Sequence, residues 1–360
     1  MATLTAIVRC FLKNDDLNFE KYSGFLKVII FFLLTMLLSA IFTGEIKIGL
    51  KRFFEAYVYR LFPLILVIIF INDIKKINKL FMLLISSLTI TNVFAITQFL
   101  LFENTRANAF AASPMSLAGF LSIMIPAILA FSIESSNKKR FSLLFIIAIV
   151  AAIFNGTRGA WVAIIFTLPI IIVPYVKKLK SLLYILMILV SLLTIAFNNT
   201  YLNNRIHSIF DLKNTSNNER ILLWESSYNM FKDNPILGVG LGQFAKEYQN
   251  NYVMPEAKYP KLGHAHNNLM QMLAETGIIG FVGFVSMFTY FIYKAILLWK
   301  KDNSSSMLIF LGGTIGLLIQ GLTEFNFGNS AVMKLYWFFM GLSLQYNYFH
   351  INKFDKGKNL

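Results

Sequence analysis

Long apolar stretches separated by short polar turns dominate the pattern of the chain. A membrane-spanning helix needs about 20 mostly apolar residues. Ten stretches approach that length, at residues 25–43, 57–72, 80–102, 114–133, 141–155, 159–176, 181–197, 277–299, 306–323 and 331–349. The pattern therefore predicts an all-α polytopic membrane protein with about ten transmembrane helices.

The composition agrees with a membrane environment. Of the 360 residues, 56% are hydrophobic and only 14% are charged, whereas a soluble domain is about 25% charged. The single cysteine, Cys10, excludes an internal disulfide framework and a cysteine-rich metal site. The first apolar run, at residues 2–12, is short and contains Arg9, so we expect no cleavable signal peptide.

The formal net charge of +15 is concentrated in alternate loops. Clusters of Lys and Arg occur at residues 75–79, 138–140, 177–180, 300–301 and 353–358. Because basic loops stay on the cytoplasmic side, both termini are predicted to lie inside the cell. Because cytoplasmic loops account for the positive charge, we expect no nucleic-acid partner. One predicted outer loop, with Lys47, Lys51 and Arg52, breaks the rule, which indicates either a function there or an error in the first helix.

A long polar loop divides the chain into three regions. Residues 1–197 carry the N-terminal transmembrane helices, 198–276 form a periplasmic or extracellular loop, and 277–360 carry the C-terminal helices and a cytoplasmic tail. Within the loop, residues 219–231 have the pattern of an amphipathic helix. Asn217 or Asn218 is its predicted N-cap.

Three arginines on the outer side are candidate binding residues. Arg158 lies at the outer mouth of two predicted helices, where an arginine is either functional or extends to water. Arg220 begins the loop helix, and either faces solvent or offers a diphosphate its planar fork of N–H donors. Arg106, in an otherwise mild outer loop, is a weaker candidate for the same role.

A polar stripe precedes the eighth predicted membrane helix. His264, Asn268, Gln271 and Glu275 share one helical face if the helix begins at His264. A histidine at this boundary suits a general base, and the alternatives are a metal ligand or a plain helix start. Without a nearby Cys or Asp cluster, we expect no metal. The glycine-rich segment 238–242 lacks the strand of a nucleotide site and is predicted to be a flexible turn.

Three sequence blocks together resemble a known family. They are TRGAW at 157–161; RILLW at 220–224 followed by NPILGVG at 234–240; and HAHN at 264–267 followed by ETGIIG at 275–280. In this order and spacing the chain resembles the O-antigen ligases, with the related O-antigen polymerases and protein O-oligosaccharyltransferases. The resemblance covers roughly residues 100–285, and the set of motifs is specific although each motif alone is weak.

The resemblance implies an enzyme with a GT-C-like membrane fold. It implies a metal-independent, inverting glycosyltransferase without a cofactor, whose donor is a glycan on undecaprenyl diphosphate at the outer face of the membrane. It implies that Arg158 and Arg220 engage the diphosphate and that a histidine activates the acceptor hydroxyl, with Arg106 similar to a less strict family arginine. Family members often have about twelve membrane helices, against ten found here.

The polar stripe and the family resemblance favour different histidines as the general base. The polar stripe favours His264, whereas the resemblance favours His266, because the His-Asn pair is the stricter family element. We predict His266 as the general base and His264 as a supporting group near the acceptor.

The acceptor decides the exact activity. A ligase would transfer the glycan to lipid A–core, and a polymerase would transfer it to another glycan repeat unit. A flippase or transporter of the lipid-linked glycan is a further alternative, but it would be expected to show internal pseudo-symmetry, and none is evident in the sequence.

Overall fold

The computed structural model describes residues 19–102, 106–174, 199–209, 211, 214–302 and 304–358, and this part of the chain contains helices and no strands. The helices are α2 Ser23–Phe42, α3 Ile46–Phe53, α4 Phe62–Phe70, α5 Ile74–Leu101, α6 Pro114–Glu134, α7 Lys138–Asn155, α8 Arg158–Ile172, α10 Thr200–His207, α11 Thr215–Asp233, α12 Phe244–Glu247, α13 Asn268–Asp302, α14 Ser305–Gln320 and α15 Ser330–Lys358. Short π-helical turns at Phe54–Val58 and Tyr248–Tyr252 and 3₁₀ turns at Phe19–Tyr22, Tyr59–Leu61 and Asn326–Gly328 complete the set.

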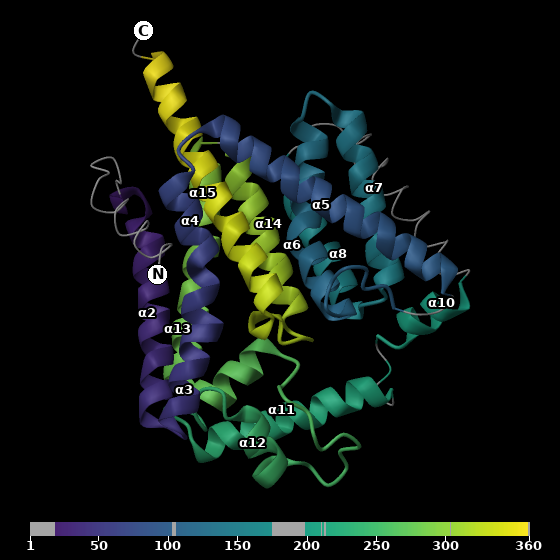
Figure 1. Cartoon of the computed structure of the whole chain (residues 1–360), viewed down its shortest axis with the longest axis vertical. Helices are drawn as coiled ribbons and strands as arrows, with labels where there is room; N and C mark the ends of the chain where they lie inside the picture. The colour runs from purple at the N-terminus through teal and green to yellow at the C-terminus, as the bar shows by residue number, and fades with distance from the viewer. Residues whose placement is uncertain are drawn as a thin grey trace.

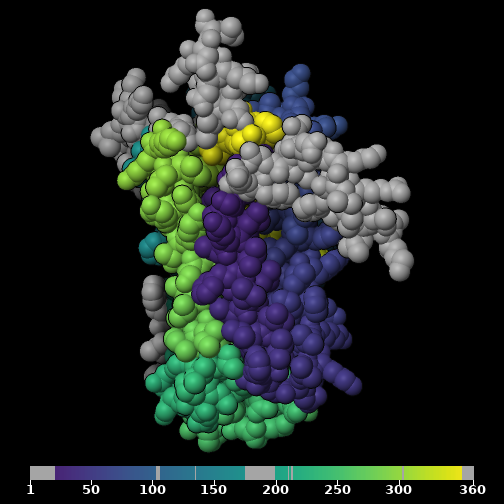
Figure 2. Space-filling model, turned by 90° about the vertical axis from the view of Figure 1, so that its left-hand side faces the viewer, coloured from purple at the N-terminus to yellow at the C-terminus, as the bar shows by residue number. Residues whose placement is uncertain are grey.

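The long helices stand side by side, and α11 and α12 lie across one end of them (Figure 1). The segment 214–267, which contains α11 and α12, is called the cross-lying region below. In Figure 2, α2 and α13 run together along one face, above the green elements of this region. The C-terminal part of α15 is at the opposite end of the molecule (Figure 1). The polar segment between α10 and α13 therefore covers one mouth of the helical bundle.

Five of the described helical segments are long and apolar enough to cross a membrane. They are Ser23–Phe42, Ile46–Phe70, Ile74–Leu101, Pro114–Ile133 and Asn268–Lys301, and two shorter apolar helices are Arg158–Ile172 and Ser305–Gln320. Many large apolar side chains on these helices are exposed, such as Leu34 at 54% and Ile90 at 65%, as expected of surfaces that contact lipid. The described residues contain helices and no strands, as predicted, and their apolar helices are consistent with a membrane protein. The ten spans stay a prediction, and the predicted span at 181–197 lies outside the described residues.

The start of the second span was predicted wrongly. Lys47, Lys51 and Arg52 do not lie in a loop: they belong to α3, which continues through a π-helical and a 3₁₀ turn into α4. Three cations within one amphipathic helix lower its average hydropathy, so the apolar pattern placed the start near residue 57. The basic residues that broke the charge rule are thus fixed on a helix that follows directly on α2.

The loop helix α11 is longer than predicted at both ends. Its N-cap is Asn214, whose side chain accepts a hydrogen bond from the backbone N–H of Ser216. The predicted caps lie inside the helix, and Asn217 donates its side-chain amide to the carbonyl of Ser208 instead. Several asparagines in one short stretch are each able to cap, so sequence alone does not select among them.

The N-terminal piece of α13 is separated from its membrane-spanning part by Gly277, which has φ 57° and ψ −159°. The helix begins at Asn268, so His264 precedes it and the predicted polar stripe loses its first member. The stripe assumed an earlier helix start, but residues 264–267 are not helical, so that assumption is wrong. The predicted membrane helix at 277–299 does begin at the break.

Two backbone segments cross tightly at this break. The turn that starts at Pro235 receives or donates four backbone hydrogen bonds with the segment around Gly277: Val239 N to Ala274 O, Gly240 N to Glu275 O, Ile278 N to Pro235 O and Ile279 N to Ile236 O. A Cβ at Gly238 would lie 2.4 Å from the backbone carbon of Glu275, and one at Gly277 would lie 2.5 Å from that of Ile236. Both positions also have positive φ, so the crossing requires glycine on each side. The predicted turn at 238–242 is present, and it is held in place by these contacts.

Candidate functional site

Two cavities lie where the cross-lying region meets the bundle. The larger has a volume of about 630 Å³ and is called the larger cavity below. The smaller, of about 280 Å³, is called the arginine cavity. Met115 and Glu324 line both, so the two cavities meet at these side chains.

The arginine cavity combines four cations with an apolar wall. Its cations are Arg106, Arg158, Arg205 and Arg220. The apolar wall is formed by Val162, Ile209, Ile221, Ile319 and Leu322. Glu324 is the one carboxylate among the described residues that line it. Such a site favours a compact polyanion attached to a hydrophobic chain.

Arg158 and Arg220 converge on one hydroxyl. Arg158 is the first residue of α8 and is only 8% exposed. Its guanidinium donates hydrogen bonds to the carbonyl and hydroxyl of Ser208, and its Nη2 lies 3.4 Å from Ser216 Oγ. Arg220 Nη1 donates to the same Ser216 Oγ at 3.1 Å. Two arginines predicted independently from sequence are therefore neighbours.

The other two arginines support the turn before α8. Arg106 Nη2 donates to Thr157 Oγ1 at 2.6 Å, and Arg205 donates from Nε and Nη2 to the Gly156 carbonyl at 3.2 and 3.0 Å. Burial, followed by the charge of Arg205, lowers the pKa of Arg106. Burial also lowers the pKa of Arg220, yet a guanidinium stays charged at neutral pH.

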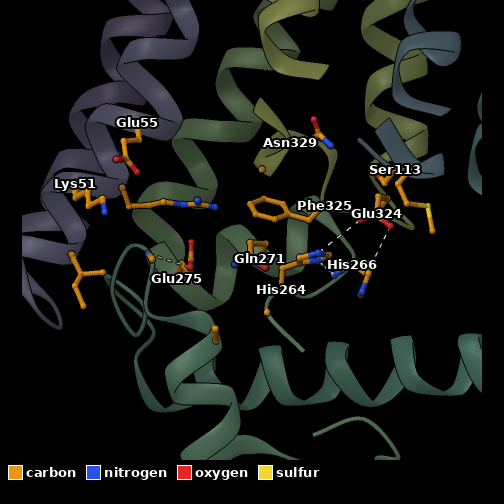
Figure 3. Close-up of a pocket in the computed structure, with 17 residues that line it drawn as sticks. Lys51, Glu55, Ser113, His264, His266, Gln271, Glu275, Glu324, Phe325 and Asn329 are labelled. Atoms are coloured by element: carbon orange, nitrogen blue, oxygen red, sulfur yellow. Dashed lines mark hydrogen bonds and ion pairs between the residues drawn. The ribbon is translucent and has the colours of Figure 1, made fainter. Parts of the chain in front are cut away.

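A histidine–glutamate pair lies at the boundary between the cavities (Figure 3). His266 Nδ1 is 3.1 Å from Glu324 Oε2, and His264 Nε2 is 4.0 Å from Glu324 Oε1. The two imidazole rings lie edge to face with centroids 4.1 Å apart. Glu324 is 7% exposed and comes from the loop between α14 and α15.

The hydrogen bonds assign different tautomers to the two histidines. A carboxylate accepts, so His266 Nδ1 carries the proton and its Nε2 keeps a free lone pair. His264 Nδ1 accepts a hydrogen bond from the His266 backbone N–H at 3.3 Å, so a neutral His264 carries its proton on Nε2. Burial, with the neighbouring charge of His266, lowers the pKa of His264 to about 4, so it is neutral at pH 7.

Glu324 is ionised in this setting. Burial by itself would raise the pKa of Glu324, but the hydrogen bond and charge of His266, with His264 and Arg220, lower the pKa overall. A carboxylate that is ionised and hydrogen-bonded to Nδ1 stabilises the imidazolium that forms when Nε2 takes a proton.

The asparagines after His266 connect its segment to the loop that carries Glu324. Asn267 Nδ2 donates to the Leu322 carbonyl at 3.0 Å. Asn268 Oδ1 accepts from the backbone N–H of Phe327 at 3.1 Å, and its Nδ2 donates to Asn326 Oδ1 at 2.7 Å. His266 itself has φ 47°, a conformation that non-glycine residues rarely adopt and that these contacts hold. The hydrogen bonds of Asn267 and Asn268 therefore fix the position of His266 relative to Glu324.

The comparison with protein families assigns this region. Residues 143–285 match the model of the family described as O-Antigen ligase. The chain carries an O-antigen ligase family domain. The match confirms the resemblance drawn from the sequence blocks, whereas no curated protein matches the chain. An activity of the O-antigen ligase or polymerase type, and hence a glycosyltransferase-like enzyme in a membrane, is supported by this match.

The O-antigen ligase family domain contains four of the five predicted site residues. Arg158, Arg220, His264 and His266 lie within it, and Arg106 precedes it. The structure brings all five to the two adjoining cavities.

Sequence reasoning missed two residues of the site. Arg205 lies on a short polar helix with no motif, and Glu324 lies 58 residues after His266, beyond the matched segment. A carboxylate in a short loop between two apolar helices was the one available signal for Glu324.

The residues also form a set that could hold a cation. One ligand atom from each of His264, His266 and Glu324 lies within 4.8 Å of the others, and two imidazoles with one carboxylate are a donor set that zinc accepts. The donor set includes Glu324, which the sequence did not place beside the histidines, and the absence of a metal stays a prediction. Against a cation, His266 and Glu324 hydrogen-bond directly, which uses one ligand atom of each, and Arg220 is close enough to affect the pKa of Glu324.

Proposed function

We propose that this chain moves a glycan from undecaprenyl diphosphate to an acceptor hydroxyl at the outer face of the bacterial inner membrane. One observation carries the proposal: a cavity with four arginines and a cavity with a histidine base meet at a single carboxylate, Glu324. The acceptor we favour is lipid A–core, which makes the enzyme an O-antigen ligase. Polymerisation onto another repeat unit is the second candidate, since both reactions use the same donor.

The arginine cavity suits the donor. A diphosphate placed between Arg158 and Arg220 would receive the N–H donors that now bind Ser216 and Ser208. Arg106 and Arg205 add positive charge at the turn before α8. The apolar wall of the cavity suits the adjoining polyprenyl chain. Preorganised cations around a leaving group stabilise the charge that develops as its bond breaks.

The larger cavity suits the acceptor. The acceptor hydroxyl would attack the anomeric carbon of the donor while its proton passes to His266 Nε2, and Glu324 stabilises the imidazolium. A new C–O bond forms, the bond from the anomeric carbon to the phosphate oxygen breaks, and the diphosphate leaves with the electron pair. Attack opposite the leaving group inverts the anomeric centre. His264, neutral and in edge-to-face contact with His266, supports the acceptor side.

The proposed topology follows from the distribution of basic residues. Ten spans in a GT-C-like arrangement, with regions 1–197, 198–276 and 277–360, place both termini in the cytoplasm and both cavities outside. Reporter fusions at Asn217 and Lys301 should give opposite compartments, and the same compartment for both would contradict the topology.

A reconstituted transfer assay tests the reaction. Purified protein in nanodiscs is supplied with an undecaprenyl-diphosphate-linked glycan and either lipid A–core or a second lipid-linked repeat unit. Glycosylated lipid A–core identifies a ligase, and a lengthened lipid-linked glycan identifies a polymerase. Movement of the donor across proteoliposomes without a new glycosidic bond would contradict both and favour a flippase.

A further inference from the structure

The larger cavity has a cationic end formed by α3. Lys51 and Arg52 line it, followed by Glu55 in the adjoining π-helical turn. The positive charge of Lys51 and Arg52 on the predicted outer side conflicts with the rule that basic residues stay on the cytoplasmic side. These two cations are therefore candidates for binding an anionic ligand.

The charged groups of this cavity differ in whether they already have partners. Glu324 is paired with His266, and Glu275 Oε1 accepts hydrogen bonds from the backbone N–H groups of Gly242 at 3.1 Å and Phe244 at 3.3 Å. Within the part of the chain that the structure describes, Lys51 and Arg52 have no carboxylate within 4.0 Å, and the buried Nε of Arg52 has no hydrogen-bond partner. Glu55 is exposed at the same end. Among the described residues, Lys51 and Arg52 thus lie at this end without an ion pair, beside the exposed Glu55, while Glu275 keeps a buried Oε2 that has no hydrogen-bond partner.

The two ends of the cavity carry different chemistry (Figure 3). Lys51 and Glu55 lie at one end, and His266 with Glu324 lies at the other. The ring of Phe325 and the amide of Gln271 lie between them. An aromatic ring beside planar amide groups suits a sugar, whose faces are apolar and whose edges carry hydroxyls.

We propose that the acceptor is an acidic saccharide, with its reacting hydroxyl at His266 and its carboxylate or phosphate group bound by Lys51 and Arg52. The inference rests on the proposed function, in which the larger cavity receives the acceptor. The Arg52 fork matches the two oxygens of a carboxylate or phosphate, and Lys51 adds a point charge near the mouth. Binding the anion at one end fixes which hydroxyl reaches the base at the other.

Lys47 separates this role from attraction to an anionic membrane surface. It lies on the same helix, one turn before Lys51, but does not line the cavity. A membrane-surface role would depend on all three cations of α3, whereas a sugar site depends on the two that line the cavity.

Direct binding of small sugars tests the proposal without any donor. The protein in phosphatidylcholine nanodiscs is titrated with glucuronate, glucose 6-phosphate and glucose, and affinities are measured by saturation-transfer NMR. Because a charge-assisted hydrogen bond contributes about 1.5–3 kcal/mol, at least one acidic sugar should bind about tenfold or more tightly than glucose. The preferred acid tells whether the group is a carboxylate or a phosphate.

Four variants locate the effect. Lys51→Ala and Arg52→Gln should each weaken binding of the acidic sugar about tenfold, and Arg52→Lys should restore part of the loss. Glu55→Gln should tighten binding, because it removes the unpaired carboxylate from the cationic end. Lys47→Ala is the matched control and should leave binding unchanged.

Equal affinity for glucose and both acids would overturn the proposal, as would an equal loss in Lys47→Ala and Lys51→Ala. These readings involve no turnover, so they are independent of the transfer reaction. A chain that binds acidic sugars through Lys51 and Arg52 but transfers no glycan would overturn the proposed function and leave this site standing.

Discussion

The two cavities that meet at Glu324 differ in how they present charge. The arginine cavity has four cations and an apolar wall, whereas the larger cavity mixes cations, carboxylates, amides and an aromatic ring. Concentrated positive charge stabilises a departing diphosphate but opposes protonation of a base. The difference shows how one site serves both needs: the four arginines gather on one side of Glu324, and the base lies on the other side, paired with the same carboxylate.

The largest expected effect falls on the base. His266→Ala should reduce transfer by about 10²–10⁴-fold, the usual contribution of a general base. His264→Ala should cost much less, because the Nδ1 of His264 already accepts a hydrogen bond from the backbone. Transfer is measured with purified lipid donor, and His207→Ala is the control, since His207 lines neither cavity. Near-normal turnover in His266→Ala with an inactive His264→Ala would reverse the assignment.

The next effect belongs to the arginine cavity. Arg158→Ala or Arg220→Ala should lower turnover about 10²–10³-fold, as removal of one preorganised charge donor does elsewhere. Lysine should rescue either position poorly, because a point charge does not reproduce the fork. Lys232→Ala, on the same helix as Arg220 but in neither cavity, is the matched control. A fully active Arg220→Ala enzyme would remove the diphosphate from this cavity.

A smaller loss is expected at the boundary. Glu324→Gln keeps the shape but removes the charge that stabilises an imidazolium at His266, so turnover should fall about 10²-fold, the lower end of what a general base contributes. Glu324→Asp should recover part of it. If Glu324 only packs the loop, Glu324→Gln would keep full activity, and its pH profile of turnover would match that of the unchanged enzyme.

The crossing of backbones predicts an effect on stability instead of chemistry. Gly238→Ala and Gly277→Ala should each destabilise the protein by about 1–3 kcal/mol or more, through strain and overlap with main-chain atoms. Gly263→Ala is the control, since a Cβ there meets nothing within 4 Å. Thermal unfolding in detergent measures the difference, and equal midpoints for the three variants would show that the crossing yields easily.

The smallest expected effect is that of a chelator. Transfer by the purified enzyme should be unchanged in EDTA, because the His266–Glu324 hydrogen bond uses one ligand atom of each residue and the positive charge of Arg220 acts on Glu324, which disfavours a bound cation. Loss of activity in EDTA that a divalent ion restores would instead make His264, His266 and Glu324 a metal centre.

The sequence predicted the parts of the site that are local in the chain. Arg158, Arg220 and His266 each lie in a short block with recognisable neighbours, and the structure brings them to the two cavities. Apolar stretches likewise predicted helices such as α2 and α6 to within a few residues, because burial in lipid or protein sets the length of a helix more strongly than any single residue does.

What the sequence did not predict depends on contacts between distant segments. Glu324 becomes part of the site only because Asn267 and Asn268 hold its loop against the histidine segment. Arg205 lies in no recognisable motif, and its place in the site becomes visible only through its hydrogen bond to the Gly156 carbonyl. The start of α13 at Asn268, in place of His264, follows from the non-helical segment before it, in which His266 has a positive φ. Helix ends are the least certain part of any pattern.

The glycine crossing also limits how this protein can vary. When a substitution overlaps a neighbouring side chain, a second substitution that shortens the neighbour relieves it. At Gly238 and Gly277 the neighbours are main-chain atoms of residues 274–276 and 236–237, which no change of codon removes. A suppressor screen that starts from either alanine variant should therefore return true revertants, and no compensating change in the side chains around the crossing.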